Sequence, residues 1–559
     1  MQLKNKDCII VMGMRLIFII AVIIFVIAYI NYGRYIKRKY RLDNMISTPS
    51  HIMNDGIDYV PTHRVVLLGH HFSSISGAGP IIGPIIAAIA FGWLPALLWV
   101  IIGSIFIGGV HDFSALVASI RHKGRSIADI AKDYLGLRAR RLFLIFVWLA
   151  LIYIIIVFVD LTSVTFIQDG GVATSSMIYI ILALIFGLCL YRFRMRLITA
   201  SFVFVPLVFI AILIGQACPL EASAITLFSL SSGKVWSIIL LIYCFVASIL
   251  PVWLLLQPRD YLSSYLLYAC VLLGALGLII GSWDINYAIY TSFKSSSLGW
   301  LFPMLFITVA CGAVSGFHSL IASGTSSKQI DKEEDAIFIG YGGMLLEGVV
   351  AVIAIATVIM LPEGSNLIKE QPLAIFASGM GNFFSSIKID SKYGVHFGLL
   401  ALSAFVLTTL DTATRIGRYV FQEFFNISGA RARFIATLST IAIPFIMVFI
   451  NFVDEAGNPI PAWKVIWPLF GSTNQLLGAL ALLVIFVWLS KLNISSKFVL
   501  FPMVFMLIVT LLSLVFLIKK FGITSVGVIA ILLFALAIFL IFEATRVIVV
   551  FIKESKKRT

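Results

Sequence analysis

The stretch THRVVLLGHHFSSISGAGPIIGPIIAAIA, residues Thr62 to Ala90, is long enough to cross a bilayer but is interrupted in its middle. The interruption holds two histidines, three serines, glycines and Pro80. Glycine and proline leave backbone N–H and C=O groups unpaired, and hydrocarbon offers those groups no partner. Such a break is tolerated only inside protein or beside a water-filled cavity. The stretch therefore predicts a discontinuous transmembrane helix whose break lines a binding site.

The composition places this stretch in a polytopic membrane protein. Of the 559 residues, 60% are hydrophobic and only 12% are charged, and the mean hydropathy is +1.06, far outside the range of soluble globular proteins. The net charge of +15 comes from basic residues in short loops, as expected of topology determinants rather than of a nucleic-acid binder. The six cysteines have no CxxC or CxxxH spacing, so neither a zinc nor a redox site is expected, and no cofactor.

Apolar runs predict about fifteen spans. One precedes the interrupted stretch, near residues 11–31, and about four follow the first eleven. The most basic loops then fall on one side, which predicts an outside amino terminus and a cytoplasmic carboxyl terminus. We therefore divide the chain into an N-terminal helix and linker (1–60), a ten-helix core (61–420) and accessory helices (421–559).

A second break is expected five spans later, at 236–257, where Ser248 and Pro251 interrupt an apolar run. The two broken spans cross in opposite directions, as an inverted repeat of five plus five helices requires. The repeats would cover about 61–217 and 236–420. The alternative is that Pro251 only kinks an ordinary membrane helix.

The two breaks favour an anionic ligand. Pro80 and Pro251 stand where second half-helices would begin, because proline suits the first helical position. Two helix amino termini near mid-membrane would attract a carboxylate, and Gly77 and Gly79 would let the backbone approach it. A small carboxylated solute is the implied substrate. The residues expected to bind it are His70, His71, Ser73, Ser74, Gly77, Gly79, Ser248 and His318.

Polar residues inside spans are candidates for coupling and gating, because they are costly in lipid. Glu347 is a candidate proton carrier, or else one partner of a buried bridge to an Arg or His. Asp112 and Asp411 lie near inner ends of spans and are read as inner-gate ion pairs, although interfacial anchors have the same pattern. Arg259 and Asp260, at the inner end of the 236–257 span, are read as gate residues too. Adjacent histidines point about 100° apart on a helix, so His70 and His71 are not expected to share a metal.

Energy is expected from an ion gradient, because no phosphate-binding loop and no GxSxG or HExxH motif occurs in the sequence. The chain is therefore read as a transporter and not an enzyme.

Six motifs, in order, resemble signature segments of the carbon starvation protein A family: GHHFSSISGAGPIIGPIIAA, GGVHDF, LLQPRDYLS, SGFHSLIASGTSSKQI, LDTATRIGRYVFQE and WPLFGSTNQLLGALALL. The resemblance implies a LeuT-like fold of the amino acid, polyamine and cation superfamily, in a bacterial cytoplasmic membrane. It also implies peptide uptake during nutrient limitation, or proton-coupled pyruvate uptake as in some relatives. Ser323 and Thr325 would then lie in the ion-site region, and the coupling ion would be H⁺ or Na⁺.

We therefore expect an all-α secondary transporter that imports short peptides by alternating access. Pyruvate or a similar monocarboxylate is the alternative substrate. A channel or a non-transporting nutrient sensor is the alternative of another class. The expected partners are the substrate and the lipid bilayer, with no nucleic acid and with homo-oligomerisation left open.

Overall fold

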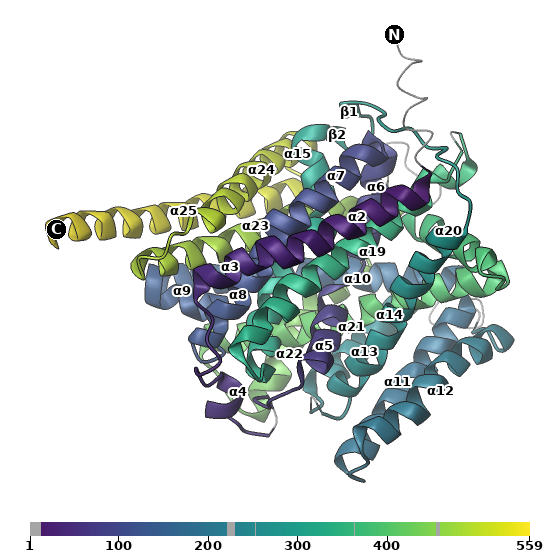
Figure 1. Ribbon diagram of the computed structural model, residues 1–559, viewed down its shortest axis with the longest axis horizontal. Coiled ribbons are helices and arrows are strands. Elements are labelled where there is room, and N and C mark those ends of the chain that lie inside the picture. The colour runs from purple at the N-terminus through teal and green to yellow at the C-terminus, as the bar shows by residue number, and fades with distance from the viewer. Residues whose placement is uncertain are drawn as a thin grey trace.

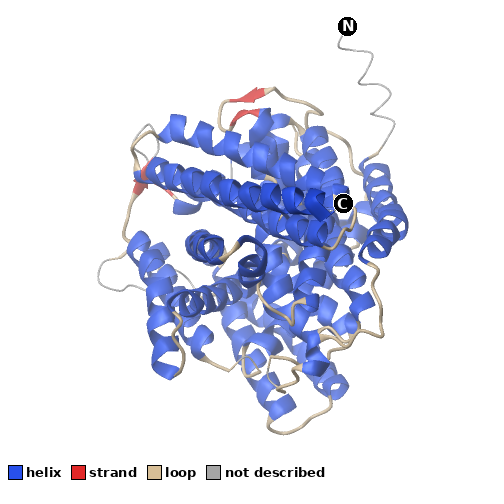
Figure 2. Ribbon diagram, turned by 90° about the vertical axis from the view of Figure 1, so that its left-hand side faces the viewer, coloured by secondary structure: helices blue, strands red, loops and turns tan. Residues whose placement is uncertain are grey.

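The computed structural model describes residues 13–56, 58–220, 230–251, 253–362, 364–369, 371–453 and 459–558. These residues form a helical membrane protein (Figure 1), with two short antiparallel strand pairs at its surface (Figure 2). Within them, 13 helices are long and apolar enough to span a membrane, or 14 if one bent pair counts as a span. Residues 301–329 contribute none of these helices, because the chain there is divided into short pieces.

The helices of the first half begin with α2 (Met14–Ala28), which continues through a π-helical turn into α3 (Arg34–Tyr40). The others are α4 (Pro49–Ile52), α5 (Arg64–Ile75), α6 (Gly79–Phe91), α7 (Trp93–Gly103), α8 (Gly109–Arg121), α9 (Ile127–Leu135), α10 (Leu137–Gln168), α11 (Gly170–Tyr191), α12 (Leu197–Ala217), α13 (Ser232–Ile249) and α14 (Leu256–Ile280).

The second half begins with the strand pair β1 (Lys294–Ser295) and β2 (Gly299–Trp300). Its helices are α15 (Leu301–Thr308), α16 (Ala310–Ala313), α17 (Gly316–Ile321), the π-helical η4 (Ala322–Ser326), α18 (Ser327–Gln329), α19 (Gly342–Ile359), α20 (Pro372–Ser386), α21 (Ser391–Phe425), α22 (Ala430–Val448), α23 (Ala462–Lys491), α24 (Lys497–Phe521) and α25 (Ser525–Arg558). The pair β3 (Phe452–Val453) and β4 (Pro459–Ile460) precedes α23.

The first expected break is present. Helix α5 ends at Ile75, α6 begins at Gly79, and their axes differ by 48°. Pro80 is in the first turn of α6, where its missing N–H and fixed φ disturb no helical hydrogen bond. The residues between the two helices are buried, so this irregular backbone is enclosed by protein and not by lipid.

The second break is not at Pro251. Helix α13 ends at Ile249, Leu250 is extended, and Pro251 lies in the connection to the separate helix α14. The residue before a proline is driven out of the helical region, so the proline ends α13 and begins no half-helix. The prediction of a half-helix start at Pro251 was therefore wrong.

The second broken helix follows β2. Between α16 and α17, Val314 and Ser315 are extended, with φ/ψ of −157°/128° and −135°/122°. The chain thus leaves the helical conformation for two residues in the interior of the protein and then resumes it. No proline marks this position in the sequence.

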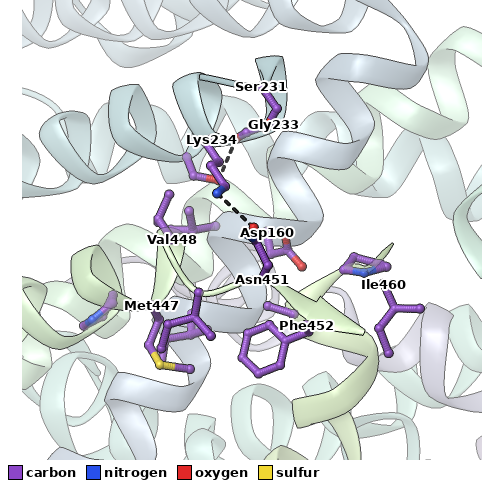
Figure 3. Close-up of a pocket in the computed structure, with 16 residues that line it drawn as sticks. Asp160, Ser231, Gly233, Lys234, Met447, Val448, Asn451, Phe452 and Ile460 are labelled. Carbon is purple, nitrogen blue, oxygen red and sulfur yellow. Dashed lines mark hydrogen bonds between the residues drawn. The ribbon is translucent and has the colours of Figure 1, made fainter. Parts of the chain in front are cut away.

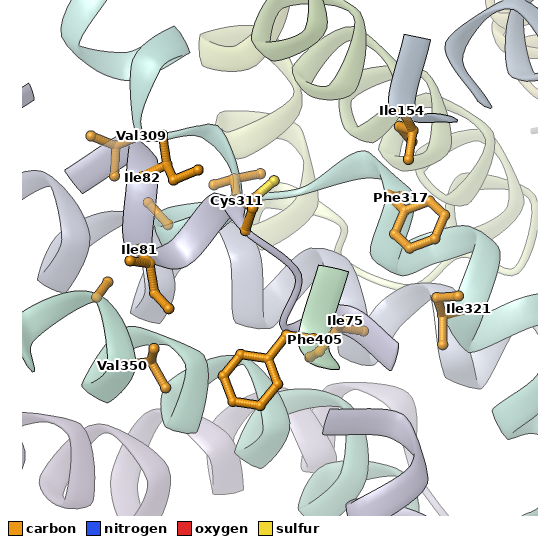
Figure 4. Packing of buried hydrophobic residues seen from close by; sticks show 14 of the residues in the cluster. Ile75, Ile81, Ile82, Ile154, Val309, Cys311, Phe317, Ile321, Val350 and Phe405 are labelled. Carbon is orange, nitrogen blue, oxygen red and sulfur yellow. The ribbon is translucent and has the colours of Figure 1, made fainter. Parts of the chain in front are cut away.

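The two broken helices cross each other. Helix α6 packs against α15 and α16, whereas α5 packs against α17. Glycine permits this close approach: a Cβ on Gly79 would lie 2.0 Å from the Cβ of Cys311, and one on Gly83 would lie 2.4 Å from the carbonyl oxygen of Thr308. Figure 4 shows Ile81 and Cys311 within the apolar packing around this crossing.

Candidate functional site

A small cavity lies where the two breaks meet, with a volume of about 10 Å³, about the space of one water molecule. Gly77 and Gly79 line it from the first break, and Ser315 and Phe317 from the second. A Cβ on Gly77 would come within 2.9 Å of Thr409 Oγ1. The glycines therefore do lie beside a cavity, although the groups nearest to them are protein side chains. The other lining residues are Ile75, Ile154, Phe158, Cys311, Thr409, Phe470 and Asn474.

Asn474 of α23 reaches into the second break. Its Oδ1 accepts a hydrogen bond from the backbone N–H of Phe317 at 2.9 Å, and its Nδ2 donates to Ser315 Oγ at 2.9 Å. The next residue, Gln475, donates from Nε2 to the carbonyl oxygen of Phe306 at 2.6 Å. The two amides thus supply partners to backbone groups of the broken helix. Amide side chains commonly join helices within membranes, and here they join α23 to the broken helix.

Glu347 of α19 is not alone in its span. His318 of α17 places Nε2 3.3 Å from Glu347 Oε2 and Nδ1 2.8 Å from Asp112 Oδ2. Asp112 also accepts a hydrogen bond from His111 Nδ1 at 2.8 Å. All four side chains are fully buried. His318 therefore bridges two carboxylates from different helices, and the bridge to a histidine that the sequence left open for Glu347 is present.

The charge of this cluster does not balance by itself. With His318 as an imidazolium, His111 neutral and both Asp112 and Glu347 ionised, the fully buried cluster carries one net negative charge. An uncompensated buried charge is costly, and a bound proton or another cation would remove it.

The adjacent histidines of α5 have different partners, as their angular separation predicts. His71 Nδ1 is 2.7 Å from Ser326 Oγ, whereas His70 Nδ1 is 3.2 Å from Asp260 Oδ2. His70 also lines a separate cavity between α5 and the start of α14. Neither histidine lines the cavity between the breaks.

The serine hydroxyls expected to face substrate bond to the backbone. Ser73 donates to the carbonyl oxygens of His70 and Asp260, at 3.2 and 3.3 Å, and Ser74 donates to that of His70 at 2.8 Å. Ser248 lies near the end of α13, where its Oγ is 3.4 Å from Thr437 Oγ1, away from both breaks. None of the three lines the cavity between the breaks.

Ser323 and Thr325 lie in η4. Ser323 donates to the carbonyl oxygen of Ser319 at 2.6 Å, and Thr325 to that of Ile321 at 2.9 Å. The carbonyl of Ser323 in turn accepts from Ser119 Oγ at 3.3 Å and from Ser327 Oγ at 3.2 Å. A π-helical turn is common at functional sites, so the local geometry agrees with the expected ion-site region without testing it.

The residues predicted to form gates do come together in part. Arg259 of α14 forms a fully buried ion pair with Asp411 of α21. Tyr243 donates to Asp411 Oδ2 at 2.7 Å and accepts from Arg259 Nη1 at 2.6 Å. The neighbouring Asp260 pairs with His70 instead, as described above. Asp112 lies with His318 and forms no part of this group.

The chain matches the family of carbon starvation protein CstA over residues 13–368 and 361–513. It belongs to that family. The peptide transporter CstA of Campylobacter jejuni subsp. jejuni is 31% identical over 558 residues, covering 88% of this chain and 78% of the relative. The pyruvate/proton symporter BtsT of Escherichia coli (strain K12) is 30% identical over 563 residues, covering 85% and 77%. The resemblance that the six motifs indicated is confirmed.

Among solved structures, a mutant of the manganese transporter of Eremococcus coleocola superposes with a TM-score of 0.45 and 15% identity, over 88% of this chain and 99% of that chain. Its overlap is too low to decide the topology of this CstA-family chain.

A larger pocket of about 220 Å³ lies elsewhere in this CstA-family protein, among α10, α13 and α22 (Figure 3). Its polar groups already have partners: Lys234 donates to Asn451 Oδ1 at 2.9 Å, and Asp160 accepts from the backbone N–H of Trp463 at 2.8 Å. Asp160 and Phe158 point about 200° apart on α10. The pocket is therefore on the opposite face of α10 from the cavity between the breaks.

Proposed function

We propose that this chain is a secondary active transporter that imports small carboxylated solutes, above all short peptides, by alternating access. The observation that carries the proposal is the meeting of two broken helices at one enclosed cavity, deep among membrane-spanning helices. Broken helices at mid-membrane supply free backbone donors and acceptors where a substrate can use them. The relatives are named peptide transporters, which favours peptides as the substrate class. Uptake would serve the cell during nutrient limitation.

The proposal includes an inverted repeat, with α5–α14 as one unit and α15–α23 as the other. In its support, helices pack in matching pairs: α14 contacts α5 as α23 contacts α17, and α10 contacts α13 as α21 contacts α22. Likewise α9 of the first unit packs on α10 and on α23 of the second unit. In the matching position, α20 of the second unit packs on α21 and on α14 of the first unit. Helices α11 and α12 would be an added hairpin at the edge of the protein (Figure 1). This division moves the second unit from the expected 236–420 to about 301–491.

For coupling, we place the transported proton on Glu347. A proton there neutralises the buried cluster that His318 and Asp112 complete, and its loss leaves a net negative charge. The proton would be released when this region opens to water. A sodium ion held near Ser323 and Thr325 is the alternative coupling ion.

For gating, the Arg259–Asp411 and His70–Asp260 pairs would close the inner side. The Arg259–Asp411 pair joins α14 of the first unit to α21 of the second, whereas the His70–Asp260 pair joins α5 to α14 within the first unit. Separating them would open a path between the cavity and the cytoplasm, with the amino terminus outside and the carboxyl terminus inside.

Pyruvate or a similar monocarboxylate is a second candidate substrate. The central cavity, at about 10 Å³, admits neither a peptide nor pyruvate in this conformation, so either substrate requires the cavity to widen. The related pyruvate/proton symporter supports pyruvate as the solute and a proton as the coupling ion.

The test is uptake into proteoliposomes that contain the purified protein. Labelled dipeptide and labelled pyruvate are offered separately under an imposed pH or sodium gradient. Accumulation of one against its own gradient, driven by one ion, supports the proposal and selects the substrate. Failure of both to accumulate under every ion condition rejects ion-coupled uptake. Flux without saturation or counterflow would favour a channel, and binding without flux a sensor.

A further inference from the structure

The side chain of Asn474 is held entirely by the second broken helix. Besides the bonds to Phe317 and Ser315, its Nδ2 lies 3.1 Å from Cys311 Sγ. These three contacts come from α17, from the extended residues of the break and from α16. Asn474 is 2% exposed and lines the cavity between the breaks. One amide group thus connects both sides of the break at the edge of the empty space.

The hydrogen bond from Phe317 is of a kind that a carboxylate makes well. An amide oxygen and a carboxylate oxygen accept the same N–H in the same geometry, and the charged acceptor binds more strongly. Ser315 Oγ is within 3.3 Å of the same Asn474 oxygen and can donate to it. A carboxylate in the place of the Asn474 oxygen would therefore find a backbone N–H and a hydroxyl already positioned.

We propose that Asn474 occupies the position of the substrate carboxylate in this conformation, and that the substrate displaces it on binding. The inference rests on the proposed function and adds a residue that determines specificity. A solute with a free carboxylate makes stronger hydrogen bonds than Asn474 does, and these offset the free energy lost when Asn474 is displaced. A neutral amide or ester of the same solute makes bonds no stronger than those of Asn474, so it is rejected.

Gln475 provides the matched control. It is adjacent on α23, is fully buried and also bonds to the broken helix through its side-chain amide, but its partner is the carbonyl oxygen of Phe306. It does not line the cavity. If both residues are only structural, their alanine variants should lose thermal stability and uptake together. If Asn474 stands in for substrate, the two variants should differ in substrate affinity.

The experiment measures uptake by Asn474→Ala, Asn474→Asp and Gln475→Ala with Ala-Ala and pyruvate, using Ala-Ala amide and pyruvamide as competitors. Removing a competing hydrogen-bonding group should lower the KM of Asn474→Ala for the transported carboxylate about fivefold. Asn474→Asp places a carboxylate in the site permanently and should raise the KM at least tenfold at neutral pH, with partial recovery when the outside pH is lowered. Gln475→Ala should leave the KM within about twofold.

A thermal-shift measurement keeps the test decisive where a variant is less stable. The transported carboxylate should raise the melting temperature of Asn474→Ala more than that of the wild type. A KM for Asn474→Ala that is unchanged or raised, or an Asn474→Asp variant with wild-type KM, would overturn the inference. Failure of the proposed function looks different, because the wild type itself would then accumulate neither Ala-Ala nor pyruvate.

Discussion

Gly79→Ala tests whether the close approach of the two broken helices requires a residue without a Cβ at position 79. The added Cβ would lie 2.0 Å from Cys311 Cβ and 2.4 Å from Cys311 Sγ, whereas the backbone Cα of Cys311 is 3.4 Å away. Side chains cannot approach so closely, so the two helices must separate. Overpacking of this kind costs about 1–3 kcal/mol, and we expect the upper part of that range because the clashing Cβ is fixed to the backbone. Uptake should be lost while the protein still reaches the membrane.

The double variant Gly79→Ala/Cys311→Gly is the decisive comparison. It removes both clashing side-chain atoms and leaves an ordinary contact with Cα, so most of the lost thermal stability and uptake should return. Gly13→Ala is the control, since a Cβ there meets no atom within 4 Å and the residue precedes α2, outside the proposed sites. Melting temperature in detergent and initial uptake rate are measured for all four proteins. Wild-type stability and uptake in Gly79→Ala, or no recovery in the double variant, would refute the packing argument.

Two further predictions concern buried charges. Glu347→Gln keeps the shape of the side chain but cannot gain or lose a proton by titration, so substrate exchange should persist while the pH dependence of uptake disappears. An unchanged pH profile excludes Glu347 from coupling. Removing one partner of the Arg259–Asp411 pair should destabilise the fold by about 3–5 kcal/mol, because the remaining charge is buried alone. The double variant Arg259→Met/Asp411→Leu should recover part of this loss in a chemical-denaturation assay, and no recovery would mean that the cost lies elsewhere. The control is the partly exposed Arg125–Asp133 pair at the surface, where breaking the pair should cost at most about 1 kcal/mol. The hydrogen bond from Arg125 holds the pKa of Asp133 below its ordinary value, so this contribution is present at neutral pH and is lost as the pH falls through that lowered pKa.

The first break could be predicted because its cause is local. Glycines, a proline and polar side chains interrupt an apolar run at 62–90, and their effect on a helix in lipid does not depend on neighbours. The second break has a weaker mark: Gly312 and Gly316 flank it, but no proline does, and Val314 and Ser315 are compatible with a helix. It is stabilised instead by Asn474, more than 150 residues away in the sequence. Pro251 was the stronger local signal, but at that position a proline ends one helix just before another begins.

The site shows the same division between local and distant causes. Glu347 and His318 could be predicted as functional residues because they are ionisable groups in apolar spans. That His318 lies between Glu347 and Asp112 depends on how α17, α19 and α8 pack, which no spacing in the sequence reveals. Ser73 and Ser74 looked like substrate donors for their position near the break, yet hydroxyls on helices commonly bond to carbonyls of the preceding turn.

Consecutive residues of α17 connect the cavity to the buried charges. The backbone N–H of Phe317 bonds to Asn474 beside the cavity, and the ring of His318 forms a hydrogen bond with Asp112 and lies 3.3 Å from Glu347 Oε2. A change at one of these contacts that rotates or shifts α17 must therefore change the other. Linkage makes the coupling reciprocal: if protonation of Glu347 tightens carboxylate binding by some factor, bound carboxylate must tighten proton binding by the same factor. Substrate affinity measured against pH, and proton uptake measured against substrate, should return one coupling free energy. A substrate affinity that does not change with pH, or a pH dependence that persists unchanged in Glu347→Gln, would show that the cavity and the charge cluster are not coupled.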